Sequence, residues 1–67
     1  MKEGETFLEM ATRHVREAEA HVTRQREIVN ELRRNGEDAT DSEALLATFE
    51  SLLRSHQLGF EIARRKP

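Results

Sequence analysis

The sequence has 67 residues and no cysteine, which leaves room for one small domain and excludes disulfides and cysteine-based zinc sites. Hydrophobic and charged residues each make up 36%, and the formal net charge is -2 at pH 7. A charge so close to neutral argues against general nucleic-acid binding, and no apolar run is long enough for a signal peptide or a membrane span. We therefore expect one cytoplasmic helical domain over residues 1–67.

A first helix is predicted over about residues 5–34, because its apolar residues repeat as a heptad. The a and d positions of this repeat are Leu8, Ala11, Val15, Ala18, Val22, Gln25, Val29 and Leu32. A third column, at the g positions, widens the apolar face beyond that of a two-stranded coiled coil. This column consists of Phe7, His14, His21 and Ile28. Gln25 is the polar exception in the heptad: it either finds a buried partner or, as we expect, keeps its amide in water.

The predicted ends of this helix follow from local chemistry. Thr6 followed by Glu9 has the spacing of a capping box. Asn35-Gly36 ends the helix, because glycine adopts the left-handed conformation without a steric penalty. The turn over about residues 35–40 is short enough to fold the next helix back beside the first.

A second helix is predicted over about residues 41–64, with a capping box made by Thr40 and Glu43. Its wide apolar face holds Leu45, Leu46, Phe49, Leu52, Leu53, His56, Phe60 and Ala63. The fold class is therefore all-α, an antiparallel two-helix hairpin.

One hairpin leaves half of that apolar face in water. We therefore expect two copies to form a homodimeric four-helix bundle, with docking on another helical protein as the alternative. The predicted core and interface residues are Leu8, Ala11, Val15, Ala18, Val22, Val29, Leu32, Leu45, Leu46, Phe49, Leu52, Leu53 and Phe60.

The three histidines, His14, His21 and His56, are the candidates for metal chemistry. If residue 34 lies across from residue 42, His56 is level with His21, and this pair would offer two imidazole ligands to zinc. No His-x-x-x-His or Glu-x-x-His motif occurs. We therefore expect half-buried boundary residues, with no metal and no cofactor.

Catalysis and phosphotransfer have little support in the sequence. In architecture the chain resembles the dimerisation domain of sensor kinases, which is a four-helix bundle of two hairpins. That family follows its histidine with a Glu and, a few positions later, a proline kink, and residues 14–18 lack this pattern. No Gly-rich phosphate loop and no Gly-x-Ser-x-Gly motif occurs, so we do not expect an enzyme.

Charged residues are mixed along both helices, and pairs such as Glu9–Arg13 and Glu50–Arg54 have helical i,i+4 spacing. The cationic cluster Arg64-Arg65-Lys66 has no aromatic platform beside it, so nucleic acid is not an expected partner.

Part of the sequence resembles short helical-hairpin proteins of alphaproteobacteria. The matching pattern is His14-Val15, His21-Val22-x-Arg24-Gln25-x-x-Ile28, Leu32, Gly36-x-Asp38, Ala44-Leu45-Leu46-x-x-Phe49, Leu52 and His56. It covers about residues 7–60 and consists mostly of heptad, turn and cap positions. That family has no assigned activity, so the resemblance implies a bacterial helical hairpin and carries over no functional residue. We predict a small self-associating interaction or regulatory protein, with a histidine-based metal-binding or phosphotransfer module as the alternative.

Overall fold

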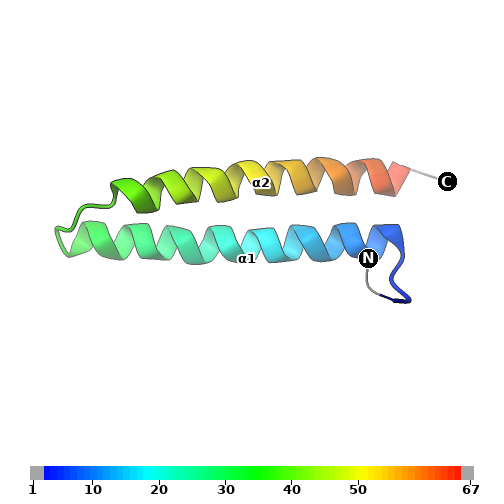
Figure 1. Cartoon of the computed structure of the whole chain (residues 1–67), viewed down its shortest axis with the longest axis horizontal. Coiled ribbons are helices and arrows are strands. Elements are labelled where there is room, and N and C mark those ends of the chain that lie inside the picture. The colour runs from blue at the N-terminus through cyan, green and yellow to red at the C-terminus, as the bar shows by residue number, and fades with distance from the viewer. Residues whose placement is uncertain (1–2, 66–67) are drawn as a thin grey trace.

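The computed structural model describes residues 3–65, which form two helices joined by a short turn (Figure 1). Helix α1 is Phe7–Arg34 and helix α2 is Thr40–Arg65. The helices contact each other side by side in opposite directions, so α1 begins at the end of the molecule where α2 ends. The predicted all-α hairpin is confirmed, in a shape of 51 × 20 × 13 Å.

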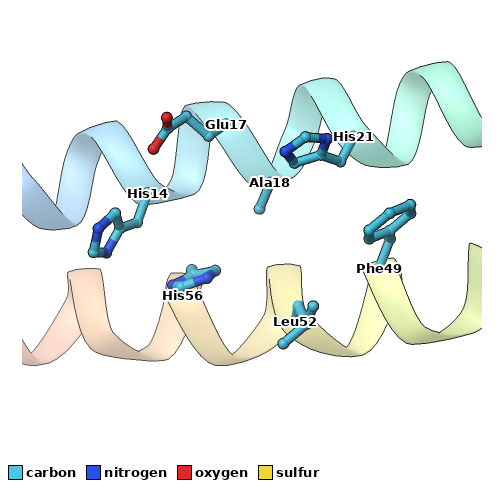
Figure 2. A pocket seen from close by; sticks show the side chains of 7 residues that line it. All are labelled: His14, Glu17, Ala18, His21, Phe49, Leu52 and His56. Carbon is cyan, nitrogen blue, oxygen red and sulfur yellow. The ribbon is translucent and has the colours of Figure 1, made fainter.

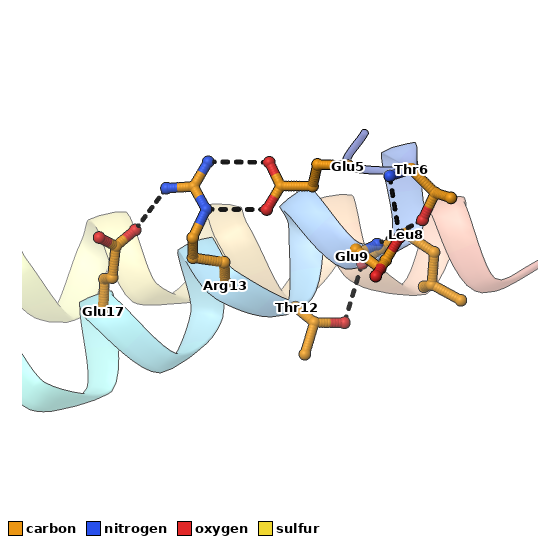
Figure 3. Close-up of polar contacts among 7 residues, drawn as sticks. All are labelled: Glu5, Thr6, Leu8, Glu9, Thr12, Arg13 and Glu17. Carbon is orange, nitrogen blue, oxygen red and sulfur yellow. Dashed lines mark hydrogen bonds and ion pairs between the residues drawn. The ribbon is translucent and has the colours of Figure 1, made fainter. Parts of the chain in front are cut away.

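Thr6 caps the start of α1, as its spacing to Glu9 predicts. The Glu9 backbone N–H donates to Thr6 Oγ1 at 3.0 Å, and the Thr6 N–H donates to the Glu9 carboxylate at 3.0 Å (Figure 3). Both halves of a capping box are present, and they satisfy two backbone donors at the helix start.

A Schellman motif ends α1 at the predicted Asn35-Gly36. Gly36 has a φ of +72°, which glycine adopts without steric cost. Its N–H donates to the Arg33 carbonyl at 3.1 Å, and the Glu37 N–H donates to the Leu32 carbonyl at 2.9 Å. Two terminal carbonyls are thereby satisfied, and the chain reverses direction directly after the helix.

The predicted second capping box is wrong, because Thr40 is already the first residue of α2. The Glu43 N–H donates to the Ala39 carbonyl at 2.8 Å, so Ala39 precedes the helix as its cap residue. The Asp38 carboxylate instead accepts from the Thr40 N–H at 3.0 Å and from Thr40 Oγ1 at 2.6 Å. The side-chain bond from Thr40, followed by the backbone bond, lowers the pKa of Asp38 below its usual value.

Asp38→Asn is expected to lower the thermal stability slightly at pH 7 and to have little effect near pH 2. Because the pKa of Asp38 is lower in the folded state, its contribution is present above the unfolded pKa of about 3.9. The contribution is lost as the pH falls through the folded-state pKa. Melting curves of both proteins from neutral to acidic pH test this, and a difference that did not shrink below about pH 4 would contradict it.

The seam between the helices is built mainly from small residues. The buried apolar residues are Ala11, Ala18, Val22, Val29, Ala39 and Ala63. The larger predicted core residues are half-buried, namely Val15, Leu32, Leu46, Phe49, Leu53 and Phe60. Three more lie exposed on the single hairpin, namely Leu8, Leu45 and Leu52. The most deeply buried seam residues are therefore alanines and valines rather than leucines and phenylalanines.

Gln25 is buried in this seam, with 6% of its surface exposed. Its Nε2 donates to the Ser42 carbonyl of α2 at 2.9 Å. The expectation that its amide lies in water is wrong, because the backbone of α2 supplies an acceptor within the seam. A buried amide with one matching acceptor fixes the register of the two helices near the turn.

Candidate functional site

The seam has two flanks of different chemistry, and the first is closed by ion pairs. Arg26 of α1 pairs with Glu50 of α2 at 3.2 Å, and Arg33 pairs with Glu43. All four residues occupy positions next to the seam on the same side of the hairpin. We call them the polar flank. The i,i+4 spacing suggested that Glu50 pairs with Arg54, but in the structure Glu50 pairs with Arg26 of α1.

Within residues 3–65, the opposite side of the seam carries no fixed charge at its flanking positions. We call these residues the open flank; they are Phe7, His14, His21, Ile28, Leu45, Leu52 and Gly59. Two hollows on this side are lined by residues of both helices, and His14, His21 and Leu52 line the first of them. Phe7, His14 and Gly59 contribute to the other. Ile28 and Leu45 are assigned to this flank by their heptad spacing.

Large apolar side chains of the open flank are left in water. Phe7 is 50% exposed, Leu45 45% and Leu52 48%. Leu58 and Ile62 are also exposed, but their helical positions place them outside this flank. The open flank is thus the surface on which exposed apolar groups and histidines occur together.

A hollow of about 340 Å³ lies at the middle of the open flank (Figure 2). Its lining residues are His14, Glu17, Ala18, His21, Phe49, Leu52 and His56. Ala18 accounts for part of the space, because its methyl group is too short to fill the seam between longer neighbours. All three histidines of the sequence meet at this hollow.

The histidines pair differently from the prediction. His14 and His56 face each other with ring centroids 5.2 Å apart and ring planes 56° apart. His21 stacks on Phe49, with centroids 5.4 Å apart and planes 19° apart. The predicted His21–His56 pair is wrong: the partner of His56 lies about two turns nearer the start of α1.

The reason for this error is that the two sides of the seam pair with different offsets. On the polar flank Arg33 pairs with Glu43, which agrees with the predicted alignment of residue 34 with residue 42. On the other side α2 contacts earlier residues of α1, and His56 therefore lies against His14 rather than His21. No sequence motif marks this offset.

Arg13 forms ion pairs with two glutamates beside the hollow (Figure 3). Its Nε and one terminal nitrogen donate to the two Glu5 carboxylate oxygens at 3.0 and 3.2 Å. Its other terminal nitrogen binds Glu17 at 3.0 Å. The bond to Glu5 is the largest of the effects that raise the pKa of Arg13 above its usual value. The predicted Glu9–Arg13 pair does not form, because Glu9 is occupied in the capping box.

Within residues 3–65, no group of three or more His, Asp or Glu side chains is arranged to hold a metal ion. His14 and His56 are half-buried, and His21 is more exposed. The site as it stands is therefore a shallow, partly apolar surface with one close histidine pair.

In the part of the chain that the structure describes, neither helix is long and apolar enough to cross a membrane. No protein-family model, curated protein or solved structure matches this chain. The resemblance to alphaproteobacterial hairpin proteins therefore stays a prediction, and the function has to be argued from the side chains themselves.

Proposed function

We propose that this chain is a small cytoplasmic interaction protein that pairs with a second copy through the open flank, forming a four-helix bundle. The observation that carries the proposal is the difference between the two flanks. Ion pairs close the polar flank, whereas Phe7, Leu45 and Leu52 of the open flank remain about half exposed. A flank of this kind is stabilised when a further apolar layer covers it.

The small core of the single hairpin supports a second copy. Among residues 3–65, Val29, with 2% exposed, is the largest side chain that is fully buried. Most of the larger apolar residues keep part of their surface in water, and two helices of this size supply little other burial. A second hairpin on the open flank adds the missing layer without any new kind of interaction.

The charge distribution favours a copy of this chain over an unrelated helix. Residues 35–43, at the turn end, contain four acidic residues and no basic one. Arg64 and Arg65 lie at the opposite end of the hairpin. A copy turned end for end brings each acidic turn towards Arg64 and Arg65 of its partner, and twofold symmetry forms this contact twice.

The proposed bundle acts by binding rather than by catalysis. Its outer surface would carry the alternating arginines and glutamates of both helices, such as the Arg24–Glu27 pair at 3.6 Å. Mixed charges of this kind suit contact with other proteins and give no preference for nucleic acid. We therefore propose that the bundle has a regulatory role and exerts it by binding another protein.

Sedimentation equilibrium at micromolar concentration tests the self-association. We expect a species of twice the 7.8 kDa chain mass. On dilution or heating, the helix content and the fraction of dimer should decrease together. A monomer that melts cooperatively would contradict the proposal, and would leave a different helical protein as the occupant of the open flank.

A further inference from the structure

We propose that His14 and His56 form a two-histidine site for a divalent transition-metal ion such as Zn²⁺, which connects α1 to α2. Both ligands belong to one chain, so the site needs no second copy; a second copy on the open flank would cover the hollow that the two rings line. The site would place a metal-dependent clamp near the end of the hairpin where α1 begins and α2 ends.

The separation of the two rings suits a shared ion. Zn²⁺ binds an imidazole nitrogen at about 2.0–2.1 Å, with tetrahedral angles between its ligands. Two imidazoles on one such ion therefore have ring centroids on the order of 5 Å apart. The observed centroids are 5.2 Å apart, and the tilt of 56° keeps the rings from stacking face to face. The spacing of the two rings at this point between the helices therefore matches that of two imidazoles on one ion.

The surroundings leave the imidazole nitrogens available. Among residues 3–65, none forms a hydrogen bond or an ion pair with the imidazole of His14 or His56. Both rings line the hollow of about 340 Å³, which has room for the waters that would complete the coordination. Imidazole ligands select zinc, copper or nickel over magnesium and calcium, which prefer oxygen.

The local charge also favours a cation. Glu17 lies one turn from His14 and lines the same hollow (Figure 2). Arg13 is shared between Glu17 and Glu5, so these three side chains together carry a net negative charge. Glu17 is a candidate to attract the ion through water, although its carboxylate is held by Arg13 and is not counted as a ligand.

His21 provides a matched control within the same chain. It lines the same hollow as the pair, but its ring stacks on Phe49 with planes only 19° apart. Two tilted rings at this distance also occur as an ordinary aromatic contact, without any metal. A comparison of the three histidine variants separates these two explanations.

The experiment is a calorimetric titration of ZnCl₂ into the tag-free full chain, after removal of metal with EDTA. Wild type is expected to bind one ion per chain and to gain thermal stability when the ion is bound. His14→Gln and His56→Gln are each expected to weaken binding by about tenfold or more, because one of two ligands is lost. His21→Gln is expected to bind Zn²⁺ as wild type does.

Any of three results would overturn the site: no saturable binding by wild type, equal loss in His21→Gln, or one ion per two chains. Sedimentation in EDTA reports the self-association separately. A dimer that binds no Zn²⁺ would contradict only the metal site, whereas a monomer that binds Zn²⁺ would contradict only the proposed function.

Discussion

Leu52→Asp should dissociate the proposed dimer and unfold the chain. Leu52 lies on the open flank, 48% exposed in the single hairpin, and lines the central hollow that a second copy would cover. An aspartate there would be buried without a partner, at a cost of about 3 kcal/mol or more. That cost corresponds to a more than hundredfold decrease in the association constant. Because folding and association share one core in the proposed dimer, the helices of the dissociated chain should also unfold.

Leu58→Asp is the matched control for this change. Leu58 belongs to the same helix and is 64% exposed, but it lies outside the open flank. The same substitution there is expected to change stability by about 0.5 kcal/mol or less and to leave the dimer intact. Circular dichroism and sedimentation of the two variants provide the comparison. If Leu52→Asp stayed a folded dimer, or if both variants dissociated equally, the open flank would not be the interface.

The hairpin itself was predictable from the sequence, because its signals are local and agree with one another. Val22 and Val29 repeat at heptad spacing and are buried in the seam. Thr6 and Gly36 mark the ends of α1 by chemistry that involves only a few neighbouring residues. Helical period, capping and turn length therefore all lead to the same fold.

The start of α2 shows where local patterns compete. Thr40 has a glutamate three residues later, so the spacing predicts a cap at Thr40. Asp38 is an equally good acceptor two residues earlier, and in the structure it binds the Thr40 N–H and hydroxyl. A sequence pattern alone does not decide between two acceptors of similar strength.

The candidate site was less predictable, because it depends on side-chain contacts and not only on the alignment of the helices. Arg33–Glu43 keeps the predicted alignment, and all three histidines line one hollow, yet His56 contacts His14 instead of His21. Beside these residues, the amide of Gln25 binds the Ser42 carbonyl of α2. That acceptor belongs to the backbone, so no residue type in the sequence announces it.

The difference between the flanks follows from the same geometry. In an antiparallel pair, each flank combines equivalent heptad positions of both helices. One flank therefore contains Arg26 and Arg33 opposite Glu50 and Glu43, and the other contains His14, His21 and Leu52. The residue types are visible in the sequence, but the side on which they gather depends on how α2 faces α1.

The two hairpins of the proposed dimer are expected to lie end for end. A side-by-side arrangement in the same direction would put two acidic turns together, each with four acidic residues over positions 35–43. The end-for-end arrangement puts each turn beside Arg64 and Arg65 of the other copy. Exposed charges are screened within about 8–10 Å, so this preference is about 1 kcal/mol and should weaken as salt is added.

A cysteine in the turn measures the orientation directly, since the chain has none of its own. Asn35 is the suitable position: it is exposed and uncharged, whereas Ala39 is only 7% exposed and would bury the label. Spin labels on Asn35→Cys are expected at opposite ends of a bundle whose hairpins are 51 Å long, tens of ångströms apart. Rapid disulfide formation between two Asn35→Cys chains would instead place the turns together. In that arrangement the apolar contacts of the open flank would outweigh the repulsion between the acidic turns.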